Sequence, residues 1–91
     1  MSEWRAEIRV MLKPSVNDPQ GMSIRNALHS LGFSSVNTVR AGKLIEVRLA
    51  ADDQAHAEAN VERMCQQLLA NPVIETYAFT LEHVPAPAPT A

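Results

Sequence analysis

The sequence predicts an α+β fold with its elements in the order strand, helix, strand, strand, helix, strand. Two observations support this order. Apolar residues alternate with period two near both ends and in the middle of the chain, which is typical of strands with one buried face. Between these segments, apolar residues recur at helical spacing. Two such β-α-β units predict a four-stranded antiparallel sheet with both helices on one face, the ferredoxin-like arrangement.

In the first half of the chain, residues 4–13 alternate and predict a strand. The next segment, "NDPQG", places Asp18 as the N-cap and Pro19 as the first residue of a helix. Gly32 follows that helix in the position that favours a left-handed residue. The predicted inward face of the strand contains Trp4, Ala6, Ile8, Val10 and Leu12, and that of the helix contains Ile24, Ala27, Leu28 and Leu31.

In the second half, residues 33–41 predict a weaker strand, rich in serine and asparagine, which a turn at Gly42-Lys43 joins to a strand over 44–49. Asp52 or Asp53 is expected to cap a second helix that reaches to about Asn71, where Pro72 stops it. Residues 73–84 predict the last strand. The expected inward residues of the second helix are Ala57, Val61, Met64, Cys65 and Leu68.

Composition restricts the organisation and the function. Residues 1–84 are expected to form one domain, and residues 85–91, "PAPAPTA", a disordered tail. A net charge of −2 gives no electrostatic footprint for nucleic acid or an anionic membrane. One cysteine excludes an internal disulfide. No apolar run approaches the roughly 20 residues of a membrane span, and no secretory signal precedes the domain, so we expect a cytoplasmic protein.

The "NDPQG" stretch also permits an enzymatic interpretation. Residues 19–25 are similar to the phosphate loop of acylphosphatases, small enzymes of this architecture. The similarity implies that Gln20, Gly21 and Arg25 bind an acyl phosphate and that Asn37 orients the attacking water. However, Pro19 removes one of the backbone N–H groups that would hold an anion. We therefore favour a helix start, and keep a stand-alone acylphosphatase-like hydrolase using Arg25 and Asn37 as the alternative.

No other polar residues form a recognisable site. His29, His56 and His83 fall in different elements without metal-ligand spacing. Cys65 lies on an apolar helix face, where a small buried side chain is expected. We therefore predict no catalytic, cofactor-binding or metal-binding residue. RNA recognition would need aromatic residues on the central strands, and the segments "EIRVML" and "LIEVRL" contain none. An amino-acid-binding domain of the ACT type is disfavoured only because such domains are usually fused to an enzyme.

Four stretches in order, "DPQG", "ALHSLGF", "VRAGKLIEV" and "LLANPVIETYAF", together resemble the PurS family, the small subunit of phosphoribosylformylglycinamidine synthase. The resemblance runs from about residue 5 to residue 82. It implies a non-catalytic subunit that bridges a large synthetase subunit and a glutaminase subunit. It also implies a holoenzyme that uses ATP and Mg, neither bound by this subunit, and a homodimer or higher homo-oligomer.

The predicted fold leaves one face of the sheet without a helix. Charges of both signs alternate there with apolar side chains, a composition that suits a protein contact better than bulk solvent. Period two places the residues of this face opposite to the core residues of the same strands. The expected interface residues are Arg9, Met11, Leu44, Glu46 and Arg48.

Overall fold

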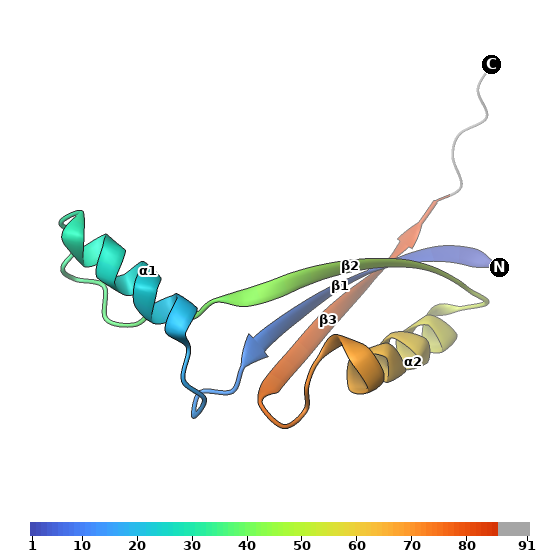
Figure 1. The fold of residues 1–91 in the computed structure, drawn as a ribbon. Coiled ribbons are helices and arrows are strands. Elements are labelled where there is room, and N and C mark those ends of the chain that lie inside the picture. Colours follow the sequence, from blue (N-terminus) through green and yellow to red (C-terminus); the bar gives the residue numbers. More distant parts are fainter. Residues whose placement is uncertain (86–91) are drawn as a thin grey trace, which may run out of the picture.

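Three long antiparallel strands form a twisted sheet in the order β2-β1-β3 in the computed structural model, which describes residues 1–85 (Figure 1). The elements are β1 (Ser2–Leu12), α1 (Pro19–Ser30), β2 (Gly42–Ala51), α2 (Gln54–Met64), the π-helical η1 (Cys65–Leu69) and β3 (Glu75–Val84). The α+β class and the two helices are confirmed. The predicted tail, residues 85–91, lies outside the described residues apart from Pro85.

The core lies between one face of the sheet and α2. Ala6, Ile8 and Val10 of β1 are fully or almost fully buried against Val61 and Cys65. The alternation of apolar residues in β1 was therefore sufficient to identify the covered face. At the start of α2, Asp53 accepts a hydrogen bond from the backbone N–H of His56 (2.8 Å), so the predicted cap is confirmed. Partly buried residues complete this core: Ile45, Val47, Leu49, Leu69, Tyr77, Phe79 and Leu81.

The end of the second helix differs from the prediction because it is π-helical. In η1 the backbone N–H of Ala70 donates to the carbonyl of Cys65 (3.1 Å), which adds one residue to the turn. An extra residue rotates the following side chains by about 100°. Leu69 therefore packs on the core, whereas Leu68 is 82% exposed. The predicted inward position of Leu68 is wrong for this reason.

The predicted fourth strand is absent from the described residues. Residues 37–41 have no regular secondary structure, and the segment returns along α1 instead of pairing with β2. The predicted turn at Gly42-Lys43 is also wrong, because Gly42 is the first residue of β2 and pairs with Met11. Backbone carbonyls of residues 36 and 37 accept hydrogen bonds from α1 side chains, so these residues bind the helix rather than a strand.

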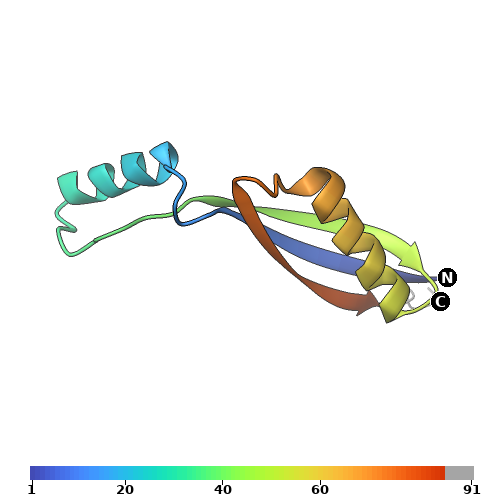
Figure 2. The same cartoon turned by 90° about the horizontal axis from the view of Figure 1, so that it is seen from below.

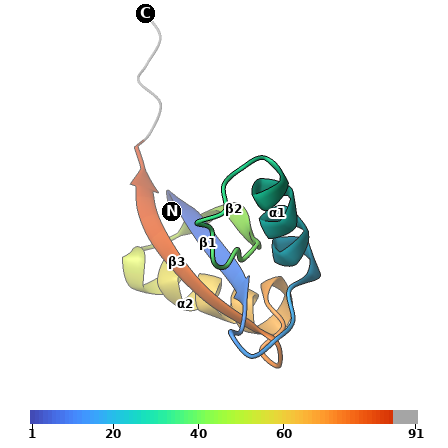
Figure 3. The same cartoon turned by 90° about the vertical axis from the view of Figure 1, so that its left-hand side faces the viewer.

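The position of α1 also differs from the prediction. It stands beyond one end of the sheet, whereas α2 lies across the sheet face (Figures 1 and 2). Seen from this end of the sheet, α1 is nearest the viewer and α2 lies farther back along the strands (Figure 3). The radius of gyration is 17.9 Å, against about 12 Å for a compact domain of this length. The ferredoxin-like placement of both helices on one face is therefore not found.

None of the helices within residues 1–85 is long and apolar enough to cross a membrane.

The π-helical register predicts different costs for two adjacent leucines. Leu69→Ala should lower the free energy of unfolding by about 2 kcal/mol, because it removes a side chain packed on the core. Leu68→Ala, the matched control, should change it by less than about 0.5 kcal/mol. Urea denaturation of the two variants measures both values. A larger loss for Leu68→Ala would contradict the register.

Candidate functional site

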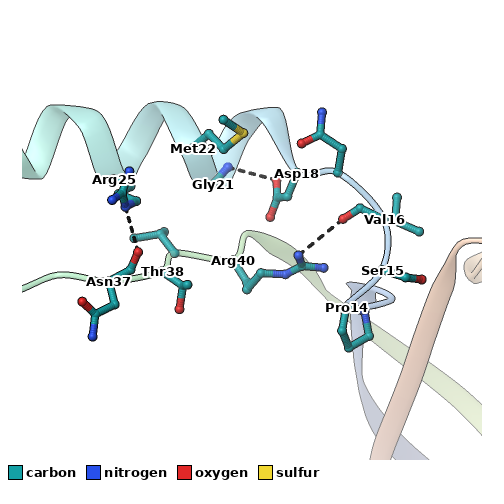
Figure 4. Close-up of a pocket in the computed structure, with 12 residues that line it drawn as sticks. Pro14, Ser15, Val16, Asp18, Gly21, Met22, Arg25, Asn37, Thr38 and Arg40 are labelled. Carbon is teal, nitrogen blue, oxygen red and sulfur yellow. Dashed lines mark hydrogen bonds between the residues drawn. The ribbon is translucent and has the colours of Figure 1, made fainter.

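A hollow of about 380 Å³ lies where β1 leads into α1 and where the returning segment approaches β2 (Figure 4). It contains three of the four residues of the acylphosphatase-like interpretation, namely Gly21, Arg25 and Asn37. These three residues of the acylphosphatase-like interpretation are thus close in space. What the hollow can bind depends on which of its polar groups are already paired.

Asp18 occupies the position that an anion would take in a phosphate loop. Its carboxylate accepts hydrogen bonds from the backbone N–H of Gly21 (2.9 Å) and from that of Ala41 (2.9 Å). Asp18 is only 6% exposed. The N–H groups of Ala41 and then Gly21 hold the pKa of Asp18 below its ordinary value, because they bind the charged form. The predicted helix cap is confirmed.

The two arginines of the hollow are bound to backbone carbonyls. Arg25 Nε donates to the carbonyl of Asn37 (2.7 Å), and Arg40 donates to those of Leu12 (3.0 Å) and Lys13 (2.8 Å). A longer hydrogen bond joins Arg40 to Val16 (3.4 Å; Figure 4). A carboxylate lies at the helix start, and both guanidinium groups are already hydrogen-bonded. These hydrogen bonds hold β1, α1 and the returning segment together, which is a structural role. The hydrolase alternative is not favoured.

Gly21 is needed because the returning segment passes very close to α1. A Cβ on Gly21 would lie 2.2 Å from the backbone oxygen of Val39 and 2.8 Å from a carboxylate oxygen of Asp18. Neither atom is at the end of a flexible side chain that can move aside freely. The glycine therefore serves a close backbone approach, and not an anion.

The second candidate surface is the sheet face that α2 does not cover. The core residues of β1 point toward α2, so the alternate residues of the same strands point away from it. Leu44 is 66% exposed and Met11 is 36% exposed on this open face. Arg9 lies directly opposite Leu44 in the register of β1 and β2. The structure thus brings the predicted interface residues together on one face: Arg9, Met11, Leu44, Glu46 and Arg48.

Ion pairs organise the charges of the open face. The register places Arg5 opposite Arg48 and Glu7 opposite Glu46, which are repulsive pairs. Other contacts compensate, since Arg48 binds Glu3 diagonally across the strands (3.1 Å) and lies 3.8 Å from Glu46 on its own strand. Arg5 binds Glu82 on the other side (2.5 Å). Among the described residues, Arg9 has no such ion-pair partner, so its charge remains available beside Leu44.

The remaining reactive side chains serve local structure. His29 donates from Nε2 to the carbonyl of Val36 (2.7 Å), His56 bonds to Asp53, and His83 stacks edge-on against Trp4. Burial, and then Glu62, raises the pKa of the Cys65 thiol, which is fully buried as predicted. Within residues 1–85, no three histidine, cysteine or acidic side chains are arranged to hold a metal ion.

Comparison with known proteins identifies the family. Residues 5–83 match the family profile described as "PurS: Phosphoribosylformylglycinamidine (FGAM) synthase". The chain belongs to the PurS family. It is therefore a subunit of FGAM synthase, a ligase of purine biosynthesis.

Relatives cover nearly the whole chain. The PurS subunit of Synechocystis sp. is 46% identical over 86% of this chain and 78% of its own length. The crystal structure of PurS from Methanocaldococcus jannaschii superposes with a TM-score of 0.79 at 35% identity, covering 90% of this chain and 99% of that one. A chain in the structure of PurLQS from Thermotoga maritima superposes with a TM-score of 0.79 at 30% identity, covering 92% and 100%.

Sequence reasoning missed one surface of this PurS chain. The apolar stripe of α1 was expected to face the core, but Leu31 is 74% exposed and Ile24 is 41% exposed. Phe33, just after the helix, is 56% exposed. The stripe itself was visible in the sequence, but its spacing does not say which molecule covers it. Besides the open face and the stripe of α1, another group of exposed apolar side chains lies where η1 leads into β3. It contains Leu68, Val73 and Ile74.

Loss of the Asp18 carboxylate should destabilise this PurS chain. Asp18→Ala should lower Tm by roughly 5 °C, because the start of α1 and the start of β2 both lose a hydrogen-bond acceptor. Asp52→Ala, an exposed aspartate beside the second cap, is the matched control and should leave Tm unchanged. Differential scanning calorimetry measures both.

The same contact predicts a pH dependence. The pKa of Asp18 is lowered by folding, so its contribution is complete above the ordinary value of 3.8 and is lost as pH falls through the folded value. The Tm difference between the wild type and Asp18→Ala should therefore be constant above about pH 5 and shrink below about pH 4. A difference that grows on acidification would contradict the assignment.

Proposed function

We propose that this chain is the non-catalytic bridging subunit of FGAM synthase. In this function it holds the ATP-dependent synthetase subunit and the glutaminase subunit in one assembly. The reaction of the assembly converts formylglycinamide ribonucleotide, glutamine and ATP into formylglycinamidine ribonucleotide, glutamate, ADP and phosphate. Membership of the PurS family, with a near-complete match to a chain of PurLQS, is the observation that carries the proposal.

The chemistry of ammonia explains why such a subunit is useful. Ammonia released from glutamine reacts only in its unprotonated form and is lost when it reaches water. The site that releases it and the site that consumes it must therefore be held together. A domain that supplies only docking surfaces meets this need, and the engaged arginines of the hollow agree with a docking role.

The open sheet face is the surface that we assign to docking and self-association. Met11 and Leu44 supply apolar area, and the charges of Arg9, Glu46 and Arg48 fix the register of the contact. ATP and Mg belong to the synthetase subunit in this proposal, which assigns neither to this chain. We also propose that the assembly works in the cytoplasm.

Introducing charge on the open face tests the proposal. Met11→Glu together with Leu44→Glu should lower synthase activity in the reconstituted three-subunit system by more than tenfold. The same variant should reduce the mass of the isolated chain in sedimentation equilibrium. Far-UV circular dichroism should be unchanged, because the core on the α2 side is untouched.

Val73→Glu is the matched control, since Val73 is 76% exposed and lies outside the open face. It should keep both the activity and the mass. A pull-down with the wild-type chain should recover two larger subunits of the same enzyme. Full activity and full mass in the Met11 and Leu44 variant would remove the open face from the proposal, and an empty pull-down would remove the bridging role.

A further inference from the structure

The last turn of the second helix contains two adjacent leucines that fit the same place in the core. Val61 and Cys65 are fully buried on the inward face of this helix. The π-turn places Leu69 next on that face and leaves Leu68 82% exposed. In an uninterrupted α-helix the inward face would continue through Leu68, which lies seven residues after Val61 and three after Cys65. The two registers therefore differ in which of two identical side chains enters the core.

The balance between the two registers depends on small terms. The π register buries Leu69 and also Ala70, which is 5% exposed. The N–H of Ala70 then donates to the carbonyl of Cys65 (3.1 Å), across a turn that is rare in proteins. The α register would bury Leu68 instead, return the N–H of Ala70 to the carbonyl of Gln66 and expose the methyl group of Ala70. The registers are thus separated by one buried methyl group on one side and one irregular turn on the other.

The helix is fixed to the sheet directly before the π-turn. The hydroxyl of Tyr77 on β3 donates to the carboxylate of Glu62. The side-chain amide of Gln66 donates to the same carboxylate oxygen (3.0 Å), which is the one-turn spacing of an α-helix. Cys65 is fully buried between these contacts and the sheet. A change of register therefore begins after Cys65 and leaves the rest of α2 in place.

The segment after the π-turn is a compact turn with its own hydrogen bonds. The carbonyl of Asn71 accepts from the N–H groups of Ile74 (3.2 Å) and Glu75 (2.7 Å). The side chain of Asn71 accepts from the N–H of Val73 (3.0 Å), and its own N–H donates to the carboxylate of Glu75 (2.7 Å). Ala70, with extended backbone angles (φ −130°, ψ 145°), is the one residue between this turn and η1. A change of register can therefore be accommodated at Ala70 without unfolding its neighbours.

We propose that the last turn of the second helix exchanges between the π register and an α register in which Leu68 replaces Leu69 in the core. The π register is the major state. The α register has a population between roughly 0.1% and 10% and forms within microseconds to milliseconds. This exchange takes place within one chain and does not depend on the proposed function. Its consequence is a change of surface, because Leu68 leaves the exposed apolar group between η1 and β3 while Leu69 turns toward solvent.

Leu69→Glu tests the exchange because it disfavours the register that buries residue 69. In this background Leu68 should enter the core, so adding Leu68→Ala should lower the equilibrium constant of folding at least tenfold. In the otherwise unchanged chain, Leu68→Ala should lower that constant by less than about threefold, since Leu68 is then in solvent. Urea denaturation of the full chain, at one protein concentration, measures these constants.

Met64→Glu is the matched control, since Met64 is a partly buried residue of the same helix that precedes the π-turn. It weakens both registers alike, so Leu68→Ala should have as small an effect in that background as in the wild type. An equally small effect of Leu68→Ala in the Leu69→Glu background would overturn the proposal. So would failure of Leu69→Glu to fold, because the α register would then be out of reach.

Methyl relaxation dispersion provides a second test on the wild type, without any substitution. The methyl groups of Leu68 and Leu69 should exchange with one common rate and one common population, because a single step moves both side chains. The methyl groups of Leu81, which packs on the same core from β3, should show no such exchange. Absence of exchange at both leucines, or exchange at unrelated rates, would overturn the proposal.

Discussion

The hydrogen bonds at the base of α1 determine how the rest of the molecule is used. Asp18 and Arg40 together connect the end of β1, the start of α1 and the start of β2. Because these bonds hold α1 beyond the end of the sheet, α2 alone covers the core face (Figure 1). The chain consequently leaves large apolar side chains of α1, such as Ile24 and Leu31, in solvent. A surface of this kind suits a subunit whose partners complete it.

The same joint explains why an anion loop was a reasonable interpretation of the sequence and why the structure does not favour it. Backbone N–H groups at the start of a helix attract any anion. Here the anion is the chain's own carboxylate, held by Gly21 and Ala41. The arginine that resembled a phosphate ligand, Arg25, holds the returning segment at the carbonyl of Asn37. Residues that bind substrate in one family thus perform a structural task in this one.

The sequence predicted what depends on local spacing. The alternation in β1, the cap at Asp18 and the left-handed Gly32 (φ 101°) are all found, because each follows from neighbouring residues. The position of Leu68 was wrong because a single π-turn changes the helical phase, and no residue type marks it. The fourth strand was wrong because the pattern over residues 33–41 was weak, and the carbonyls of residues 36 and 37 bind side chains of α1 and not a neighbouring strand.

For the open face, the sequence could predict which residues share a surface but not what that surface meets. Period two requires that Met11 and Leu44 point away from Ile8 and Ile45 whatever lies beyond them. The stripe of α1 is different, because its expected cover, the sheet of its own chain, is out of reach. Two apolar surfaces that face different directions permit two contacts at once. Under the proposed function, two such surfaces would let a bridging subunit meet two neighbours of the assembly at once.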